Sequence, residues 1–126
     1  MSMDKKTTKV IGTASNCFTV SHVETIDKPV YIEADAPANT VAILGSLPIG
    51  TAPVFYLNPA NEIAPELSEG KFCLIRIGDG RGFLGVVVAC LEHKDKFDIS
   101  DLNGNCHIRS VSVKSVTPII SAQFAA

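Results

Sequence analysis

The sequence predicts a mainly β protein, a small and partly open β-barrel with no more than short helical turns. Apolar and β-branched residues alternate with polar residues in ten short runs, which is the period of half-buried strands. Turn-forming residues separate the runs, and nine glycines and seven prolines are spread along the chain. This spacing is typical of folds built from many short strands. No window keeps the helical period, which excludes a helix-turn-helix module within these residues.

The elements follow from these runs in chain order. The predicted strands are 9–11, 17–23, 30–33, 40–44, 54–57, 72–77, 83–91, 96–99, 107–113 and 116–120. The links 78–82 (GDGRG) and 103–105 (NGN) are typical of tight hairpin turns. Residues 67–69 predict one helical turn. The whole chain, 1–126, is expected to form a single β domain, with an N-terminal arm and the first strands in 1–28.

Composition and charge exclude several classes of protein. Hydrophobic residues make up 46% and charged residues 19%, so the chain is not of the disordered type. Eleven basic residues stand against thirteen acidic ones, and only Lys5, Lys6 and Lys9 lie close together. We therefore expect no direct binding of nucleic acid. No apolar run approaches the roughly 18 residues of a membrane helix, and no signal peptide precedes the strands, which predicts a cytoplasmic protein.

The cysteines and histidines form no metal-binding pattern. None of the four cysteines lies within the short C-x₂₋₄-C spacing of zinc ligands, so the sequence predicts no metal and no cofactor. Cys73 and Cys90 stand in apolar runs, which predicts buried free thiols. Cys106 precedes His107, but neighbours in a strand point to opposite faces and do not readily share a metal or a proton. His93 is expected in a solvated turn.

One stretch carries a family resemblance. Residues 62–76 read EIAPELSEGKFCLIR, and the spacing from Glu62 through Pro65 to Gly70 is similar to the Ser-Met, Pro and Gly-Asp pattern of LexA-like and phage-repressor C-terminal domains, the S24 family of self-cleaving peptidases. Further similar segments bring the region of resemblance to roughly 52–121. The resemblance implies a β-clip-like fold of the LexA C-terminal type.

The catalytic positions of that family are not kept. The serine position falls on Glu62, and the lysine position falls on Gly85, or on Leu84 if the register slips by one residue. A carboxylate cannot replace a lysine-activated hydroxyl, and neither Gly nor Leu accepts a proton. The Ala-Gly or Cys-Gly bond that the family cleaves does not occur in the sequence. The resemblance therefore implies a non-cleaving member, not an enzyme.

Two alternatives to this interpretation remain at the level of sequence. Ser68 and Lys71 have the S-x-x-K spacing of some acyl-enzymes, although Gly70 and Pro65 argue against the continuous helix that such a pair needs. The chain is also compatible with a stand-alone small β-barrel, a structural or accessory protein of a virion or mobile element.

The main functional hypothesis is a dimerisation domain of a phage- or prophage-type transcriptional repressor. Its partner would be a second copy of itself, and it would reach DNA only indirectly, through a helix-turn-helix segment outside these residues. Residues 110–116 alternate Ser or Lys with Val, so this strand either covers the core or pairs with its copy across a twofold axis. The predicted self-association residues lie in the closing strands: Val111, Val113, Val116, Ile119 and Ile120.

Overall fold

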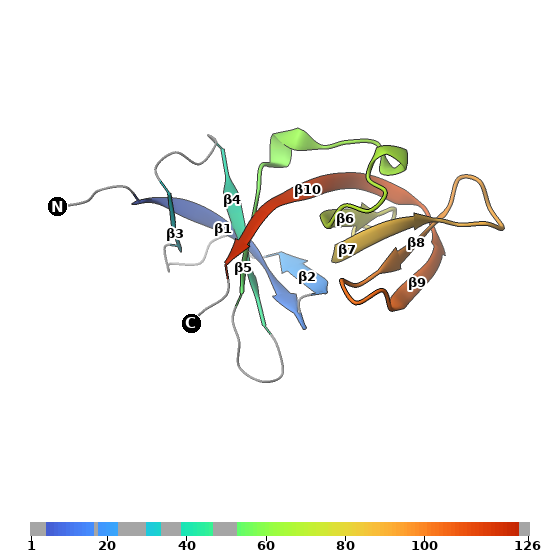
Figure 1. Ribbon diagram of the computed structural model, residues 1–126, viewed down its shortest axis with the longest axis horizontal. Helices are drawn as coiled ribbons and strands as arrows, with labels where there is room; N and C mark the ends of the chain where they lie inside the picture. Colours follow the sequence, from blue (N-terminus) through green and yellow to red (C-terminus); the bar gives the residue numbers. More distant parts are fainter. Residues whose placement is uncertain (1–4, 17, 23–29, 34–38, 47–52, 124–126) are drawn as a thin grey trace.

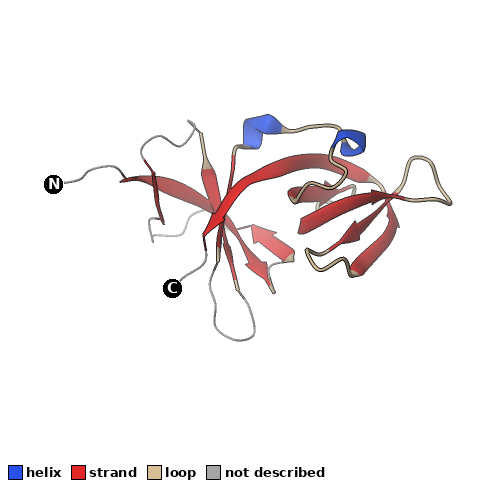
Figure 2. Cartoon of the chain, in the orientation of Figure 1, coloured by secondary structure: helices blue, strands red, loops and turns tan. Residues whose placement is uncertain are grey.

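The computed structural model describes residues 5–16, 18–22, 30–33, 39–46 and 53–123, which form the mainly β fold that the sequence predicts (Figures 1 and 2). Within these ranges lie ten strands and two single-turn 3-10 helices. The strands are β1 (Lys5–Ser15), β2 (Thr19–His22), β3 (Val30–Glu33), β4 (Val41–Gly45), β5 (Val54–Leu57), β6 (Cys73–Ile77), β7 (Gly82–Ala89), β8 (Phe97–Ser100), β9 (Cys106–Val111) and β10 (Val113–Gln123).

The two 3-10 helices stand between β5 and β6. They are η1 (Pro59–Asn61) and η2 (Pro65–Leu67), and each begins with a proline, whose fixed φ suits the first helical position. The helical turn predicted at 67–69 therefore lies two residues earlier in the structure. Asn58 caps η1, because its side-chain oxygen accepts a hydrogen bond from the amide of Ala60 at 2.9 Å.

Seven strands close a ring of hydrogen bonds. Their order is β2-β1-β4-β5-β10-β6-β7, and β2 then pairs with β7 through Thr19–Phe83 and Val20–Gly82. The β1–β4 pair is parallel and every other pair in the ring is antiparallel. β8 and β9 extend the sheet beyond the ring from β7, and β3 extends it from β1. The result is a partly open β fold.

The N-terminal segment is more ordered than the predicted arm. β1 starts at Lys5 and not at residue 9, and its first residues pair with β3, Lys5 opposite Glu33 and Thr8 opposite Val30. The sequence showed no apolar alternation in 5–8, so the pattern starts the strand too late. Lys9 is exposed on this strand.

β7 changes its partner halfway along its length. Its first half, Gly82 to Gly85, pairs with β6, and its second half, Val86 to Ala89, pairs with β8. Gly85 stands at the change. A Cβ atom at this position would lie 2.3 Å from the carbonyl oxygen of Ser100, which real side chains never do. Glycine thus lets the end of β8 approach β7.

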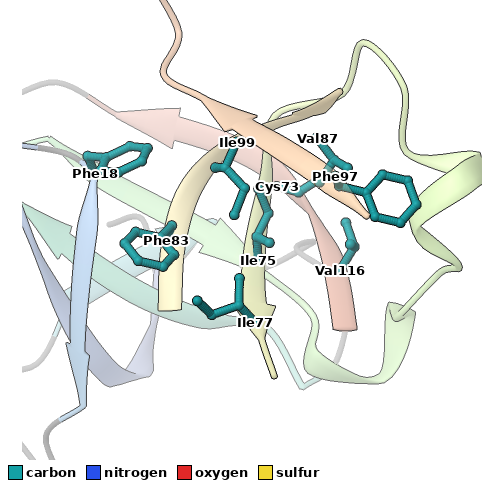
Figure 3. Close-up of a cluster of buried hydrophobic side chains, with 9 residues drawn as sticks. All are labelled: Phe18, Cys73, Ile75, Ile77, Phe83, Val87, Phe97, Ile99 and Val116. Carbon is teal, nitrogen blue, oxygen red and sulfur yellow. The ribbon is translucent and has the colours of Figure 1, made fainter. Parts of the chain in front are cut away.

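β6 separates two hydrophobic cores. Because successive side chains alternate between the faces of a strand, Cys73, Ile75 and Ile77 enter one core and Leu74 enters the other. In the first core, Phe18 from the β1–β2 turn faces Phe83 (Figure 3). The remaining buried members of this core are Val87, Phe97, Ile99 and Val116. The second core is formed with Leu74 by Ala14, Val20, Ile43, Phe55, Leu57 and Leu84.

β10 is an interior strand between β5 and β6, and it joins the sheet formed by β1 to β5 to the sheet formed by β6 to β9 (Figure 1). Val113 to Pro118 pair with β6, and Ile119 to Gln123 pair with β5. On the edge that faces away from β6, Val116 also forms an isolated bridge with Ile63. At Val116 the strand is therefore paired on both sides, which favours the interpretation that this strand covers the core. Of the strands beyond the ring, β9 ends the sheet with an outer edge that no described strand pairs.

Candidate functional site

The two positions that the family resemblance assigns to catalysis do not meet. Glu62 is exposed at the end of η1, whereas Gly85 is buried on β7. Two strands, β10 and β6, lie between the segment at Ile63 and β7. Three inter-strand spacings amount to about 14 Å, and a base must lie within roughly 3 Å of the proton it removes. The alternative position, Leu84, is fully buried in the second core.

Ser68 is a structural residue at the end of η2. It is fully buried, and its hydroxyl donates a hydrogen bond to the carbonyl oxygen of Pro65 at 2.7 Å. A nucleophilic serine must instead donate to a base. Lys71 is exposed, and it contacts Ser68 through its backbone amide, which donates to the Ser68 carbonyl at 2.9 Å. The S-x-x-K spacing thus forms a capped turn.

Of the five predicted self-association residues, one is buried, three are half-buried and one is exposed. Val116 is fully buried in the first core, and Val111 and Val113 pack against the same core. Ile119 packs against the second core. Ile120 alone of these five residues is exposed, at 44%. The prediction of a self-association role is therefore wrong for Val116, because its side chain faces the first core, which is the alternative that the sequence left open for this strand.

The described cysteines occupy three different environments. Cys73 is a buried free thiol as predicted, and burial raises the pKa of its thiol to about 11. Cys90 is only half-buried and belongs to neither core, so the prediction of a buried thiol is wrong for it. It falls outside the cores because β7 ends at Ala89 and not at residue 91 as predicted. Cys106 is exposed.

A hydrogen-bonded pair stands beside the β8–β9 turn. Nε2 of His107 lies 2.7 Å from Oδ2 of Asp101, whose Oδ1 accepts hydrogen bonds from the amides of Asn103 and Asn105. The hydrogen bond from His107 is the largest cause that holds the pKa of Asp101 below its ordinary value. Asp101 therefore caps the turn. His93 is exposed in the β7–β8 turn, also as predicted.

A hollow of about 400 Å³ lies on the outer side of the β7–β8–β9 sheet. Val87 and Ile99 point from this sheet into the first core, so their neighbours Val88 and Asp98 point outward. The turn after β7 forms one wall, and the end of β9 forms the other. We call this site the β7–β9 hollow, and it is lined by Val88, Ala89, Cys90, Leu91, Glu92, Asp98, Arg109 and Ser110.

The walls of the hollow are joined by hydrogen bonds. The Cys90 thiol lies 3.3 Å from the hydroxyl of Ser110, and Asp98 accepts a hydrogen bond from the Ser110 amide at 2.9 Å. The Cys90 amide donates to the carbonyl of Lys96 across the turn. Hydrogen bonds to the thiol, from Ser110 first and then from the backbone amide of Glu92, lower the pKa of Cys90.

Sequence reasoning missed the apolar side chains of the hollow. Leu91 is completely exposed and Val88 is 44% exposed. The strand predicted at 83–91 includes both of them, and its pattern gave no sign that they are exposed. The signal that marks Leu91 is its place at the head of a charged segment, LEHKD, which is a turn in the structure.

Comparisons with known proteins assign no family to this chain. No known protein family matches the chain, and no curated protein matches it in sequence. In the part of the chain that the structure describes, no helix is long and apolar enough to cross a membrane. The same residues contain no group of three or more His, Cys, Asp or Glu side chains placed to hold a metal ion.

Proposed function

We propose that this chain is a non-enzymatic self-association domain, of the kind that joins the subunits of LexA-like and phage repressors. Its partner is a second copy of itself, and any effect on DNA is indirect. The observation that carries this proposal is the β7–β9 hollow, which is lined by two exposed apolar side chains, Val88 on β7 and Leu91 in the turn after it. Two exposed apolar side chains around one concave site are a candidate contact surface, whereas exposed apolar residues scattered singly need no explanation.

The residues at the family's catalytic positions support a contact function over peptidase activity. Glu62 and Gly85 lack a nucleophile and a base. The close approach of Ser100 to Gly85 also leaves no room for a lysine side chain without displacing β8. We therefore expect the purified protein to stay intact during alkaline incubation, the condition that would deprotonate a catalytic lysine. A specific cleavage product that Ser68→Ala abolishes would contradict this expectation.

The direct test of the proposal is the mass of the protein in solution. We expect sedimentation velocity at micromolar concentrations to show a dimer that dissociates on dilution. A clean monomer at several hundred micromolar would overturn the proposal.

A second candidate is a stand-alone structural or accessory β protein of a virion or mobile element. The observation that favours it is the closed ring, in which β1 and β2 are integral members of the sheet. This candidate predicts a monomer that keeps its fold without a partner, so the same sedimentation experiment separates the two.

A further inference from the structure

The β7–β9 hollow and the apolar side chain that could fill it in a second copy lie on the same face of the molecule. Leu91 is completely exposed and stands on the wall of the hollow, so a protruding apolar side chain and a concave site occupy the same face. In a twofold contact the same patch faces itself, and a protrusion beside a hollow can then fill the hollow of the partner in both directions.

The charges of the hollow are also self-complementary. Glu92 and Arg109 both line it, from opposite walls, and neither forms an ion pair with a described residue. Asp98 accepts the amide hydrogen bond of Ser110 and keeps its negative charge, so the hollow holds two carboxylates and one guanidinium group. A twofold axis through the hollow brings Glu92 of one copy toward Arg109 of the other, and the reverse contact follows by symmetry.

The walls are fixed before any partner arrives. The Cys90–Ser110 and Asp98–Ser110 hydrogen bonds join the β7 side to the β9 side, and the turn is closed by the Cys90–Lys96 backbone hydrogen bond. A preformed surface loses little conformational entropy on binding. Other exposed apolar residues lie on separate elements, such as Leu67 on η2 and Leu102 in the β8–β9 turn.

We propose that two copies of the chain join through the β7–β9 hollow, with Leu91 of each copy seated in the hollow of the other and Glu92 paired with Arg109 across the twofold axis. This inference rests on the proposed self-association and names the surface that performs it. A stable interface buries about 800 Å² per partner, so the contact extends from the hollow over the 91–96 turn and the outer edge of β9.

The test uses four single variants of the full chain in a sedimentation concentration series. We expect Leu91→Asp to raise the dimer dissociation constant about 30-fold or more, as truncation of a central contact does. Leu67→Asp introduces the same change at an exposed leucine outside the hollow and should leave the constant unchanged. Matching circular dichroism spectra establish that both variants are folded.

The charge pair gives an independent readout. Glu92→Arg and Arg109→Glu should each weaken the homodimer, because each places like charges across the axis. An equimolar mixture of the two variants restores both opposite-charge contacts, so we expect a heterodimer to form.

The results of these experiments distinguish an error in the proposed surface from an error in the proposed self-association. If the wild-type chain dimerises but Leu91→Asp behaves like Leu67→Asp and the mixture forms no heterodimer, this surface is wrong while the proposed function stands. The hollow would then be open to a different occupant, such as a small molecule. If the wild-type chain is monomeric at several hundred micromolar, the surface and the proposed function both fall.

Discussion

The imidazole ring of His107 lies against the phenyl ring of Phe18, with the two ring centroids 4.3 Å apart. Phe18 belongs to the β1–β2 turn, and its carbonyl accepts a hydrogen bond from the amide of Leu84 on β7 at 2.8 Å. His107 belongs to β9, outside the ring. The contact therefore ties the outer hairpin to the place where β2 closes the ring, and Asp101 holds the imidazole there.

We expect the titration midpoint of Asp101 to lie below the ordinary value of 3.8, because His107 donates a hydrogen bond to the carboxylate. The folded state thus favours the ionised form. Its contribution to stability is present above the pKa of the unfolded state and is lost as the pH falls through the folded pKa. Carbon-detected NMR of the carboxyl group measures the midpoint, and His107→Ala should move it upward.

Asp79 provides the control for this titration. Its pKa is also lowered, first by the hydrogen bond from the Arg81 amide and in part by the Arg81 side chain, at a site remote in sequence from His107. Its midpoint should not respond to His107→Ala. An unchanged Asp101 midpoint in that variant would show that the hydrogen bond is not formed in solution.

The thiols should react in a fixed order at neutral pH. The lowered pKa of Cys90 raises its thiolate fraction, and the thiolate is the form that alkylating reagents attack. Cys73 is buried and its pKa is raised to about 11, so it should react only after unfolding. Site-resolved mass spectrometry after timed iodoacetamide labelling measures both rates.

Ser110 gives the matched variant for Cys90. Since the hydroxyl of Ser110 stabilises the Cys90 thiolate, Ser110→Ala should slow the labelling of Cys90 and leave Cys73 protected. Equal labelling of Cys90 in the two proteins would contradict the assigned contact.

Gly85→Ala should destabilise the fold strongly. The new methyl group would lie 2.3 Å from the Ser100 carbonyl, so either β7 or β8 must shift. We expect the free energy of unfolding in urea to fall by about 3 kcal/mol, the upper range of overpacking effects. Gly78→Ala is the control, because its Cβ would meet Ser112 at an ordinary 3.8 Å and should cost less than about 0.5 kcal/mol. Similar losses in the two variants would refute the close approach.

The interior place of β10 predicts opposite results for two apolar residues of the same strand. Val116→Asp buries a carboxylate in the first core and should lower the free energy of unfolding by about 4 kcal/mol or more. Ile120→Asp lies on the exposed part of β10 and should change it by less than about 1 kcal/mol. Thermal unfolding followed by circular dichroism compares the two. A folded Val116→Asp variant would contradict this position of β10.

The local pattern of the sequence predicts the strands well where apolar residues alternate or cluster. The predicted ranges 30–33 and 54–57 agree with β3 and β5. Prediction fails where polar residues pair, as at the start of β1 opposite β3. Such a segment forms a strand only because a neighbouring strand pairs with it. Ring closure lies beyond local pattern altogether, because Thr19 pairs with Phe83, which is about half of the chain away.

The candidate site was harder to predict than the fold. Apolar residues in a strand pattern are assigned to the core by default. This assumption is right for Val116, which is buried, and wrong for Leu91, which is completely exposed. Whether an apolar residue is buried depends on where its strand ends, and β7 ends at Ala89. The charges of Glu92 and Arg109 gain meaning only when the β7–β8–β9 sheet brings them to one hollow.

The place of β10 governs when this protein can fold during its synthesis. β10 is the last of the described strands along the chain, yet the ring and the first core both require it. Until it leaves the ribosome, the strands made earlier have β5 and β6 edges without their partner. Pairing at such sequence separation slows folding and leaves strand edges exposed to aggregation until β10 is in place. A ribosome-stalled chain that ends before residue 113 should therefore be sensitive to protease along its whole exposed length.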